Sequence, residues 1–214
     1  MEYASALFES AAYLSQAGIE MSHAIAPGNP FLDVARNQLC ATFLASDATD
    51  LLFVDADVGW NAKALTRVLS WPQEIVGGLV PKRDATREDS FHMNALTGKM
   101  SSEGLFEAIE IPTAFLRIKR SALERLQAVG LGTDERPFFK IGSRKEDFGE
   151  DIYFCRRWVE TGQKLWVDSD LTFTHRGGKV WRGNFFEHAI KSGILVQPDQ
   201  TAVSMAAEES ENGF

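Results

Sequence analysis

Apolar residues follow two different periods along this chain. In several segments they recur every three or four positions, which predicts amphipathic helices. Continuous apolar runs stand between these segments, which predicts strands covered on both faces of a sheet. We expect helices at about residues 2–17, 31–46, 62–70, 121–129, 150–161 and 184–191. We expect strands at about residues 51–55, 74–80, 105–109, 114–118, 164–167 and 171–174.

The order of these elements predicts the fold class. Helices and buried strands alternate in the first half of the chain, which indicates an α/β fold with a mixed, mostly parallel sheet flanked by helices. The strands at 105–109 and 114–118 are close enough in sequence to form a hairpin-like pair. Residues 84–104 are polar and contain Gly, Ser and Thr, so we interpret them as a loop. We expect one domain over residues 1–196 and a polar, acidic tail at 197–214.

Three polar or turn-forming positions predict where helices begin and end. Asn61 precedes an apolar stripe and is expected to cap a helix, which the Trp71-Pro72 pair then ends. Ser121 is expected to cap the helix that follows the strand at 114–118.

Composition narrows the class of protein. The chain has 214 residues with 44% hydrophobic content, enough for a sizeable core, and its net charge of -8 argues against a broad nucleic-acid surface. Cys40 and Cys155 lie in predicted helices without zinc-site spacing, so we expect free buried thiols. No apolar run reaches the roughly 18 residues of a membrane span, and no basic signal sequence opens the chain. We therefore expect a cytoplasmic protein.

The strand at 51–55 runs into two carboxylates, Asp55 and Asp57. Open α/β sheets bind ligands at the carboxyl ends of their strands. Two neighbouring carboxylates repel each other in a crevice unless a cation lies between them, and hard oxygen ligands suit Mg²⁺ or Mn²⁺. Taken alone, the pair fits a polar turn equally well.

Further candidates lie elsewhere. Glu150 and Asp151 begin a helix, where acids commonly do no more than stabilise the helix dipole, but where a carboxylate can also serve as a general base. His175 ends an apolar run before two glycines. Arg36 interrupts an apolar helical stripe, and either reaches water or an acid, or binds a phosphate. Gly78 lies near the end of the strand at 74–80, where a glycine lets a ligand approach the backbone. Lys82 follows that strand, where its positive charge can meet an anionic ligand.

Each of these motifs is short, but their order is informative. Taken together, they resemble the GT-A class of nucleotide-sugar glycosyltransferases, especially its family-2-like bacterial and phage branch, over roughly residues 2–182. The residues that carry the resemblance are Ala35–Asn37, Leu51–Asp57, Val76–Gly78, Pro81, Lys82, Gly149–Asp151, His175, Gly177 and Gly178.

The resemblance implies a metal-dependent hexosyltransferase that moves a sugar from a nucleotide-sugar donor to the hydroxyl of a glycan or other acceptor. It implies that Asp55, Asp57 and His175 hold Mn²⁺ or Mg²⁺, and that Asp151, beside Glu150, is the base. It further implies that Arg36, Asp55, Lys82 and Gly78 line the donor site. The class normally begins with a strand that holds the nucleobase, whereas this chain begins with a predicted helix, so that part of the pocket is expected to be missing or built otherwise.

Two alternatives stay open. Haloacid-dehalogenase-like phosphatases also carry an apolar strand that ends in Asp-x-Asp, although usually near the N-terminus and followed by small residues, whereas Val58-Gly59-Trp60 follows here. The other alternative is a catalytically inactive, truncated GT-A domain that only binds its ligand.

Overall fold

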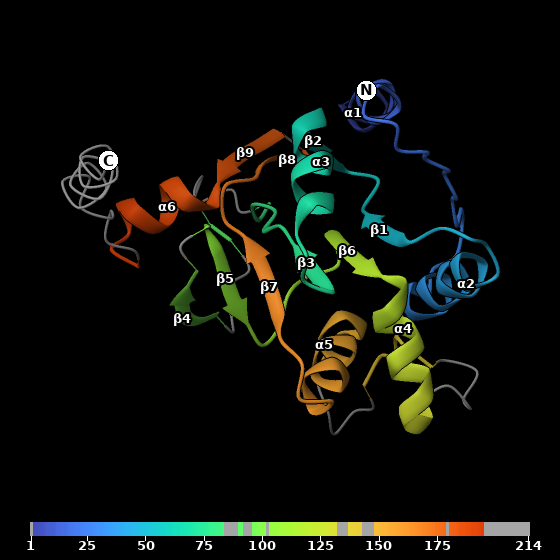
Figure 1. Ribbon diagram of the computed structural model, residues 1–214. Helices are drawn as coiled ribbons and strands as arrows, with labels where there is room; N and C mark the ends of the chain where they lie inside the picture. Colours follow the sequence, from blue (N-terminus) through green and yellow to red (C-terminus); the bar gives the residue numbers. More distant parts are fainter. Residues whose placement is uncertain are drawn as a thin grey trace, which may run out of the picture.

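The computed structural model describes residues 2–83, 90–91, 96–101, 103–131, 137–142, 148–178 and 180–194. These residues form an α/β fold with a six-stranded sheet, a three-stranded sheet and flanking helices (Figure 1). The helices are α1 (Glu2–Gln16), α2 (Leu32–Leu44), α3 (Ala62–Ser70), α4 (Arg120–Leu126) with the π-helical turn η1 (Gln127–Leu131), α5 (Glu150–Glu160) and α6 (Phe185–Lys191). The strands are β1 (Asp50–Val54), β2 (Val58–Trp60), β3 (Ile75–Gly77), β4 (Leu96–Met100), β5 (Leu105–Ala108), β6 (Phe115–Lys119), β7 (Leu165–Asp168), β8 (Thr172–Arg176) and β9 (Val180–Asn184).

The large sheet is mixed, as expected, but its pairing is mostly antiparallel. Its strand order is β1-β6-β3-β7-β5-β4, and among these neighbours only β3 and β7 pair in parallel. The expected mostly parallel sheet is therefore wrong. The physical reason is β6, which inserts between β1 and β3 and runs against both, so that two strands of the same direction are never adjacent there.

The expected hairpin of β5 and β6 is also wrong. β5 pairs with β7 and β4, whereas β6 pairs with β1 and β3 at the other side of the sheet. β4 falls within residues 84–104, which the sequence predicted to be a loop, and residues 84–89, 92–95 and 102 of that stretch lie outside the described residues. The predicted tail at 197–214 likewise lies outside them.

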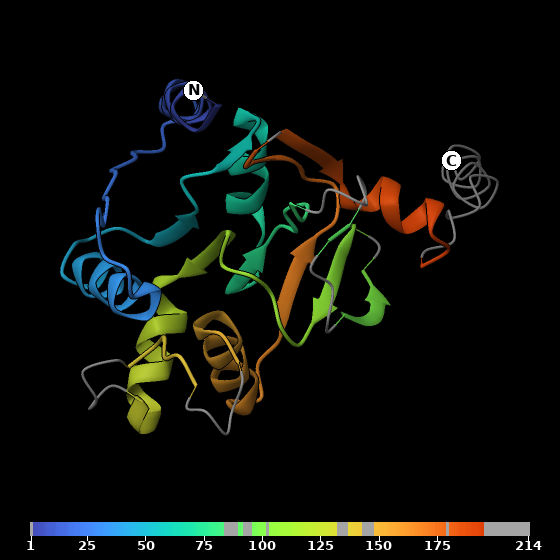
Figure 2. The same ribbon diagram turned by 180° about the vertical axis from the view of Figure 1, so that it is seen from behind.

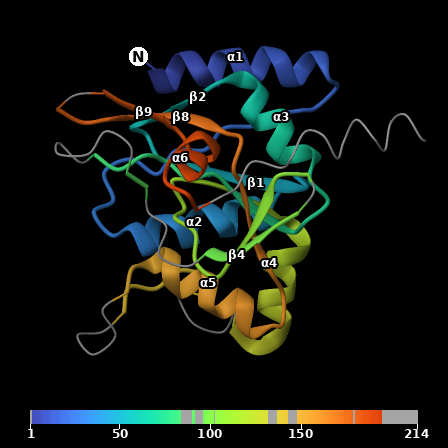
Figure 3. The same ribbon diagram turned by 90° about the vertical axis from the view of Figure 1, so that its left-hand side faces the viewer.

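Two hydrophobic cores cover the two faces of the large sheet. On β1, Phe53 packs into one core and the half-buried Leu52 packs against the other, as alternation along a strand requires. α2, α4 and α5 cover the first face, and α1 and α3 lie on the opposite side with the small sheet (Figures 2 and 3). The end of β1 thus lies between the helices of the first face and the small sheet.

The predicted helix ends were only partly correct. The side chain of Asn61 accepts a hydrogen bond from the backbone N–H of Ala64 at 2.9 Å, and α3 ends at Ser70, directly before the Trp71-Pro72 pair, as expected. Ser121 does not cap α4, because the helix begins one residue earlier and the Ser121 hydroxyl donates to Glu74 Oε1 at 2.7 Å. Instead of capping the helix, the Ser121 side chain connects α4 to the segment before β3 through this hydrogen bond.

Arg117 on β6 is a buried residue whose side chain connects several segments of the fold. Its side chain is fully buried, and its guanidinium donates to the carbonyl oxygens of Val68, Trp71 and Gln73 at 2.7–3.2 Å. Burial lowers the pKa of this guanidinium, and the carboxylate of Asp50, 3.6 Å away, opposes that shift. One side chain therefore fixes the connection between α3 and β3 to the neighbouring strand β6.

Both cysteines are free and buried, as the sequence predicted. Burial raises the pKa of the Cys155 thiol to about 12, and raises that of Cys40 as well. Neither thiol is thus suited to act as a nucleophile near neutral pH. Within the described residues, no helix has the length and apolar content needed to cross a membrane.

Candidate functional site

Asp55 and Asp57 lie in the short turn that joins the two sheets. β1 ends at Val54 in the large sheet, and β2 begins at Val58 in the small one. The backbone N–H of Val58 donates to the carbonyl of Asp55 at 3.0 Å, which closes the turn. Asp55 therefore belongs to the edge of the large sheet, and Asp57 to the edge of the small sheet.

Arg36 connects Asp55 with Glu150. The guanidinium comes from α2, donates to Glu150 Oε1 through Nη1, and lies 3.4 Å from Asp55 Oδ1 through Nη2. Arg36 and Glu150 are 7% and 8% exposed, so this is a buried ion pair with a half-buried third member. Of the two sequence interpretations of Arg36, pairing with an acid is the one observed.

Asn37 fixes the loop that closes this side of the site. Its side-chain amide donates to the carbonyls of Asp33 and Phe139, both at 2.7 Å. Its carbonyl oxygen accepts from the backbone N–H groups of Phe138 and Phe139 at 2.9 and 3.2 Å. The Phe139 ring, held in this way, stacks on Phe154 of α5 with ring centroids 4.7 Å apart. The helices that carry Arg36 and Glu150 are thereby joined.

A second cluster surrounds Asp57. Its Oδ2 lies 2.9 Å from Arg83 Nη1 and 3.5 Å from His175 Nε2. The His175 Nδ1–H donates to the carbonyl of Pro81 at 2.7 Å. In the neutral ring this bond leaves Nε2 unprotonated, so that a lone pair faces the carboxylate of Asp57.

The predicted metal ligands come together only in part. Across the part of the chain that the structure describes, no three His, Cys, Asp or Glu side chains gather closely enough to hold one metal ion. Asp57 and His175 are adjacent, whereas Asp55 faces Arg36. Two protein ligands still fit Mg²⁺ or Mn²⁺, because such ions commonly take one or two side chains and complete their shell with water and phosphate. The residues present therefore fit a divalent cation at Asp57 and His175.

The other predicted residues lie around these clusters. Asp151 is half-buried, and its Oδ1 accepts from the backbone N–H of Ile152 at 2.8 Å. The backbone N–H of Lys82 donates to the carbonyl of Ser90 at 2.6 Å, beside Pro81, which holds His175. A Cβ on Gly78 would overlap the Phe173 ring, so the close approach expected at this glycine is made by the chain itself.

Arg83 was not selected from the sequence as a site residue, although it belongs to the Pro81-Lys82-Arg83 turn. Its contact with Asp57 spans 26 residues and depends on the turn after β3 meeting the turn after β1. No local pattern distinguishes Arg83 from Lys82, so only the fold selects between them.

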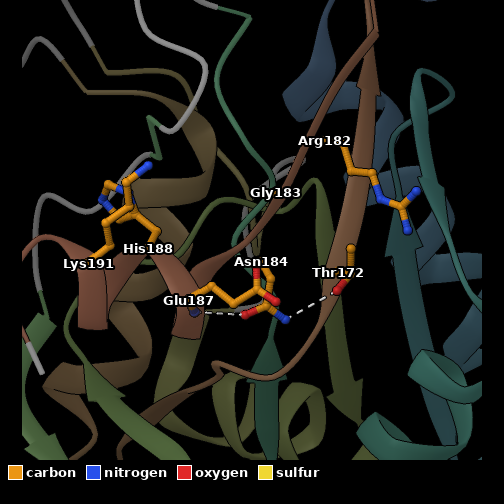
Figure 4. Close-up of a pocket in the computed structure, with 7 residues that line it drawn as sticks. All are labelled: Thr172, Arg182, Gly183, Asn184, Glu187, His188 and Lys191. Atoms are coloured by element: carbon orange, nitrogen blue, oxygen red, sulfur yellow. Dashed lines mark hydrogen bonds between the residues drawn. The ribbon is translucent and has the colours of Figure 1, made fainter. Parts of the chain in front are cut away.

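A separate hollow lies at the far end of the small sheet (Figure 4). Thr172 and Asn184 are partners at this end of β8 and β9, whereas His175 pairs with Trp181 at the other. The Asn184 side chain donates to Thr172 Oγ1 at 3.2 Å and accepts from the backbone N–H of Glu187 at 3.1 Å. The hollow is lined by Thr172, Arg182, Gly183, Asn184, Glu187, His188 and Lys191, none of which the sequence analysis selected.

Comparison with known proteins gives limited guidance. No family model and no curated protein matches the chain. Among solved structures, the crystal structure of A197 from STIV is similar, with a TM-score of 0.49 and 21% identity, over 80% of this chain and 78% of that one. A TM-score below 0.5 at this identity identifies neither a family nor an activity.

Proposed function

We propose that this protein is a metal-dependent glycosyltransferase of the GT-A class, which moves a sugar from a nucleotide-sugar donor to an acceptor hydroxyl. The observation that carries the proposal is the convergence at the end of β1. Arg36 contacts Asp55 and Glu150 there, although Arg36 and Glu150 are 114 positions apart in the sequence. Asp57 contacts His175 and Arg83 beside it. Buried charges and lone pairs gathered at a strand end are typical of a ligand site.

The reaction requires stabilisation of the leaving diphosphate and removal of the acceptor proton, and different residues would serve each requirement. Asp57 and His175 would hold Mn²⁺ or Mg²⁺, which supplies Lewis-acid stabilisation of the departing diphosphate when bound. Arg83 adds positive charge beside Asp57, and Lys82 precedes it in the sequence. Asp151 would accept the proton of the acceptor hydroxyl, while Arg36 holds Glu150 and Asp55 in fixed positions. Among the described residues, Asp151 Oδ2 has no hydrogen-bond partner and is free for this role.

A nucleotide-sugar screen tests the proposed class. In the presence of Mn²⁺, we expect one donor to raise the thermal midpoint by about 5–10 °C at 100 times its dissociation constant, because a ligand that binds only the folded state stabilises it by roughly 2.7 kcal/mol. The same donor with EDTA is the control and should give a much smaller shift. If no nucleotide sugar of any base shifts the midpoint with Mn²⁺ present, the proposal is wrong.

Asp151→Asn separates the base from the donor site. The substitution is expected to leave the donor-induced thermal shift unchanged and to lower turnover by about 10²–10⁴-fold, because the amide cannot accept the proton. Turnover is measured as release of the nucleoside diphosphate from the donor that the screen identifies. Asp170→Asn, on an exposed loop carboxylate, is the matched control. Wild-type turnover in Asp151→Asn would assign the base elsewhere.

The same measurements separate the alternatives. Metal-dependent hydrolysis of a generic phosphomonoester without donor binding would favour a phosphatase, and donor binding without transfer or hydrolysis would favour an inactive binding domain. We further expect a cytoplasmic protein whose acceptor is a glycan or another hydroxyl compound rather than a nucleic acid, since the net charge is -8.

A further inference from the structure

We propose that Arg83 exchanges partners when the donor binds: it neutralises Asp57 in the free protein and moves to the donor diphosphate once a divalent cation takes its place. This inference rests on the proposed function and assigns a donor-binding role to a residue that the family resemblance does not select. The supporting observation is that Arg83 and His175 both approach Oδ2 of Asp57, the oxygen that a cation at this site would use.

In the ion pair, a cation contacts the carboxylate oxygen that also faces His175. Arg83 Nη1 is 2.9 Å from Asp57 Oδ2, and His175 Nε2 lies 3.5 Å from the same oxygen. A neutral histidine presents a lone pair to this carboxylate, because Pro81 holds the proton at Nδ1. In that neutral form the lone pairs of Nε2 and Oδ2 repel each other, and the positive charge of Arg83 offsets the repulsion.

The chain is shaped to let Arg83 reach this position. A Cβ at Gly177 would come within 3.0 Å of Arg83 Cδ and 2.9 Å of the Trp181 ring, so the glycine makes room for the arginine stem. Gly177 follows β8 directly and is two residues beyond His175. The same small turn therefore positions His175 and accommodates Arg83.

The pair is also weak enough to exchange. The side chains of Arg83 and Asp57 are 51% and 36% exposed, so water screens their attraction. A divalent cation at Asp57 would repel the guanidinium, and a diphosphate bound to that cation offers two oxygens that match the planar guanidinium fork. Arg83 can thus move from Asp57 to the diphosphate while the cation neutralises Asp57, so that no charge is left without a partner.

The exchange predicts two effects of opposite sign for Arg83→Gln. With Mn²⁺ alone, the variant should bind the ion about three- to fivefold more tightly than wild type, because the competing cation is gone. With Mn²⁺ saturating, its affinity for the nucleoside diphosphate should fall roughly tenfold, because a charge-assisted hydrogen bond is lost. A purely structural role for Arg83 would not strengthen one ligand while weakening the other.

The measurements are Mn²⁺ titration followed by electron paramagnetic resonance, and calorimetry with ADP, CDP, GDP and UDP at saturating Mn²⁺. Arg176→Gln is the matched control, because it removes the same charge one residue after His175, from a side chain that makes no contact with Asp57 among the described residues. The proposal is supported if Arg83→Gln shows both effects and Arg176→Gln shows neither.

Two results would overturn it. If Arg83→Gln and Arg176→Gln bind Mn²⁺ equally well, or if the nucleotide affinity of Arg83→Gln equals that of wild type, Arg83 does not exchange, and the proposed glycosyltransferase function is unaffected. If wild type binds neither Mn²⁺ nor any of the four nucleotides, the proposed function fails and the exchange fails with it.

Discussion

Replacing Asp57 by alanine is expected to remove Mn²⁺-dependent donor binding, with a loss of at least about 100-fold in Mn²⁺ affinity. Asp57 is the only carboxylate that the described residues place beside His175, so no neighbouring acid can take over its role. A histidine alone is a poor site for these hard ions, which prefer oxygen ligands. The expected loss is measured by Mn²⁺ titration and by the donor-induced thermal shift.

Asp47→Ala is the matched control for this substitution, because it removes the same charge from an exposed position before β1. It should leave both measurements near wild type. We expect Asp55→Ala to weaken donor binding as well, but through the loss of a partner for Arg36. Full Mn²⁺-dependent activity in Asp57→Ala would show that the cation, if one is used, binds somewhere else.

Replacing Arg117 by methionine is expected to destabilise the fold by about 3–5 kcal/mol. Methionine keeps an apolar stem of similar length but leaves the carbonyls of Val68, Trp71 and Gln73 without their side-chain donor. It also leaves the half-buried carboxylate of Asp50 without its nearest cation. The measurement is the free energy of unfolding in urea.

Arg125→Met is the control, because Arg125 lies on the surface of α4 and pairs with Glu74 at 3.5 Å. An exposed pair of this kind contributes no more than about 1 kcal/mol. Equal unfolding free energies for the two variants would mean that the buried hydrogen bonds of Arg117 contribute little beyond those that water offers.

Local patterns were sufficient to locate most helices and the strand that carries the candidate site. The apolar run before Asp55 predicted a strand at 51–55, and β1 spans Asp50–Val54. Glu150 begins α5, as the two acids at that helix start indicated. These features depend on residues close in sequence, through side-chain periodicity and the helix dipole.

The strand pairing was not predictable in the same way. The position of β6 between β1 and β3 depends on contacts across more than 60 residues to β1 and about 40 residues to β3, and nothing in its own sequence specifies its neighbours. The strands β2, β4 and β9 were missed because each contains a glycine, which weakens the pattern of a strand, and β2 has only three residues. Both β2 and β9 pair with β8, which is far from β2 in the sequence.

The candidate site was predicted as a set of residues but not as a set of contacts. Asp55, Asp57, His175 and Glu150 do lie around one turn, yet the charges meet in pairs that the sequence did not indicate. Arg36 contacts two carboxylates, which agrees with its predicted pairing with an acid, and its predicted phosphate contact stays a prediction. Arg83 had no local feature that separated it from its neighbours.

The turn between β1 and β2 has a consequence for how this protein can evolve. Asp55 and Asp57 lie in the turn that joins two different sheets, so the relative orientation of their side chains depends on how the sheets pack, and that packing includes the fit of Phe173 against Gly78. Mutations at such remote contacts can retune the separation of the two carboxylates while both remain in place. Selection for a different ligand therefore has a route that spares the chemical groups themselves.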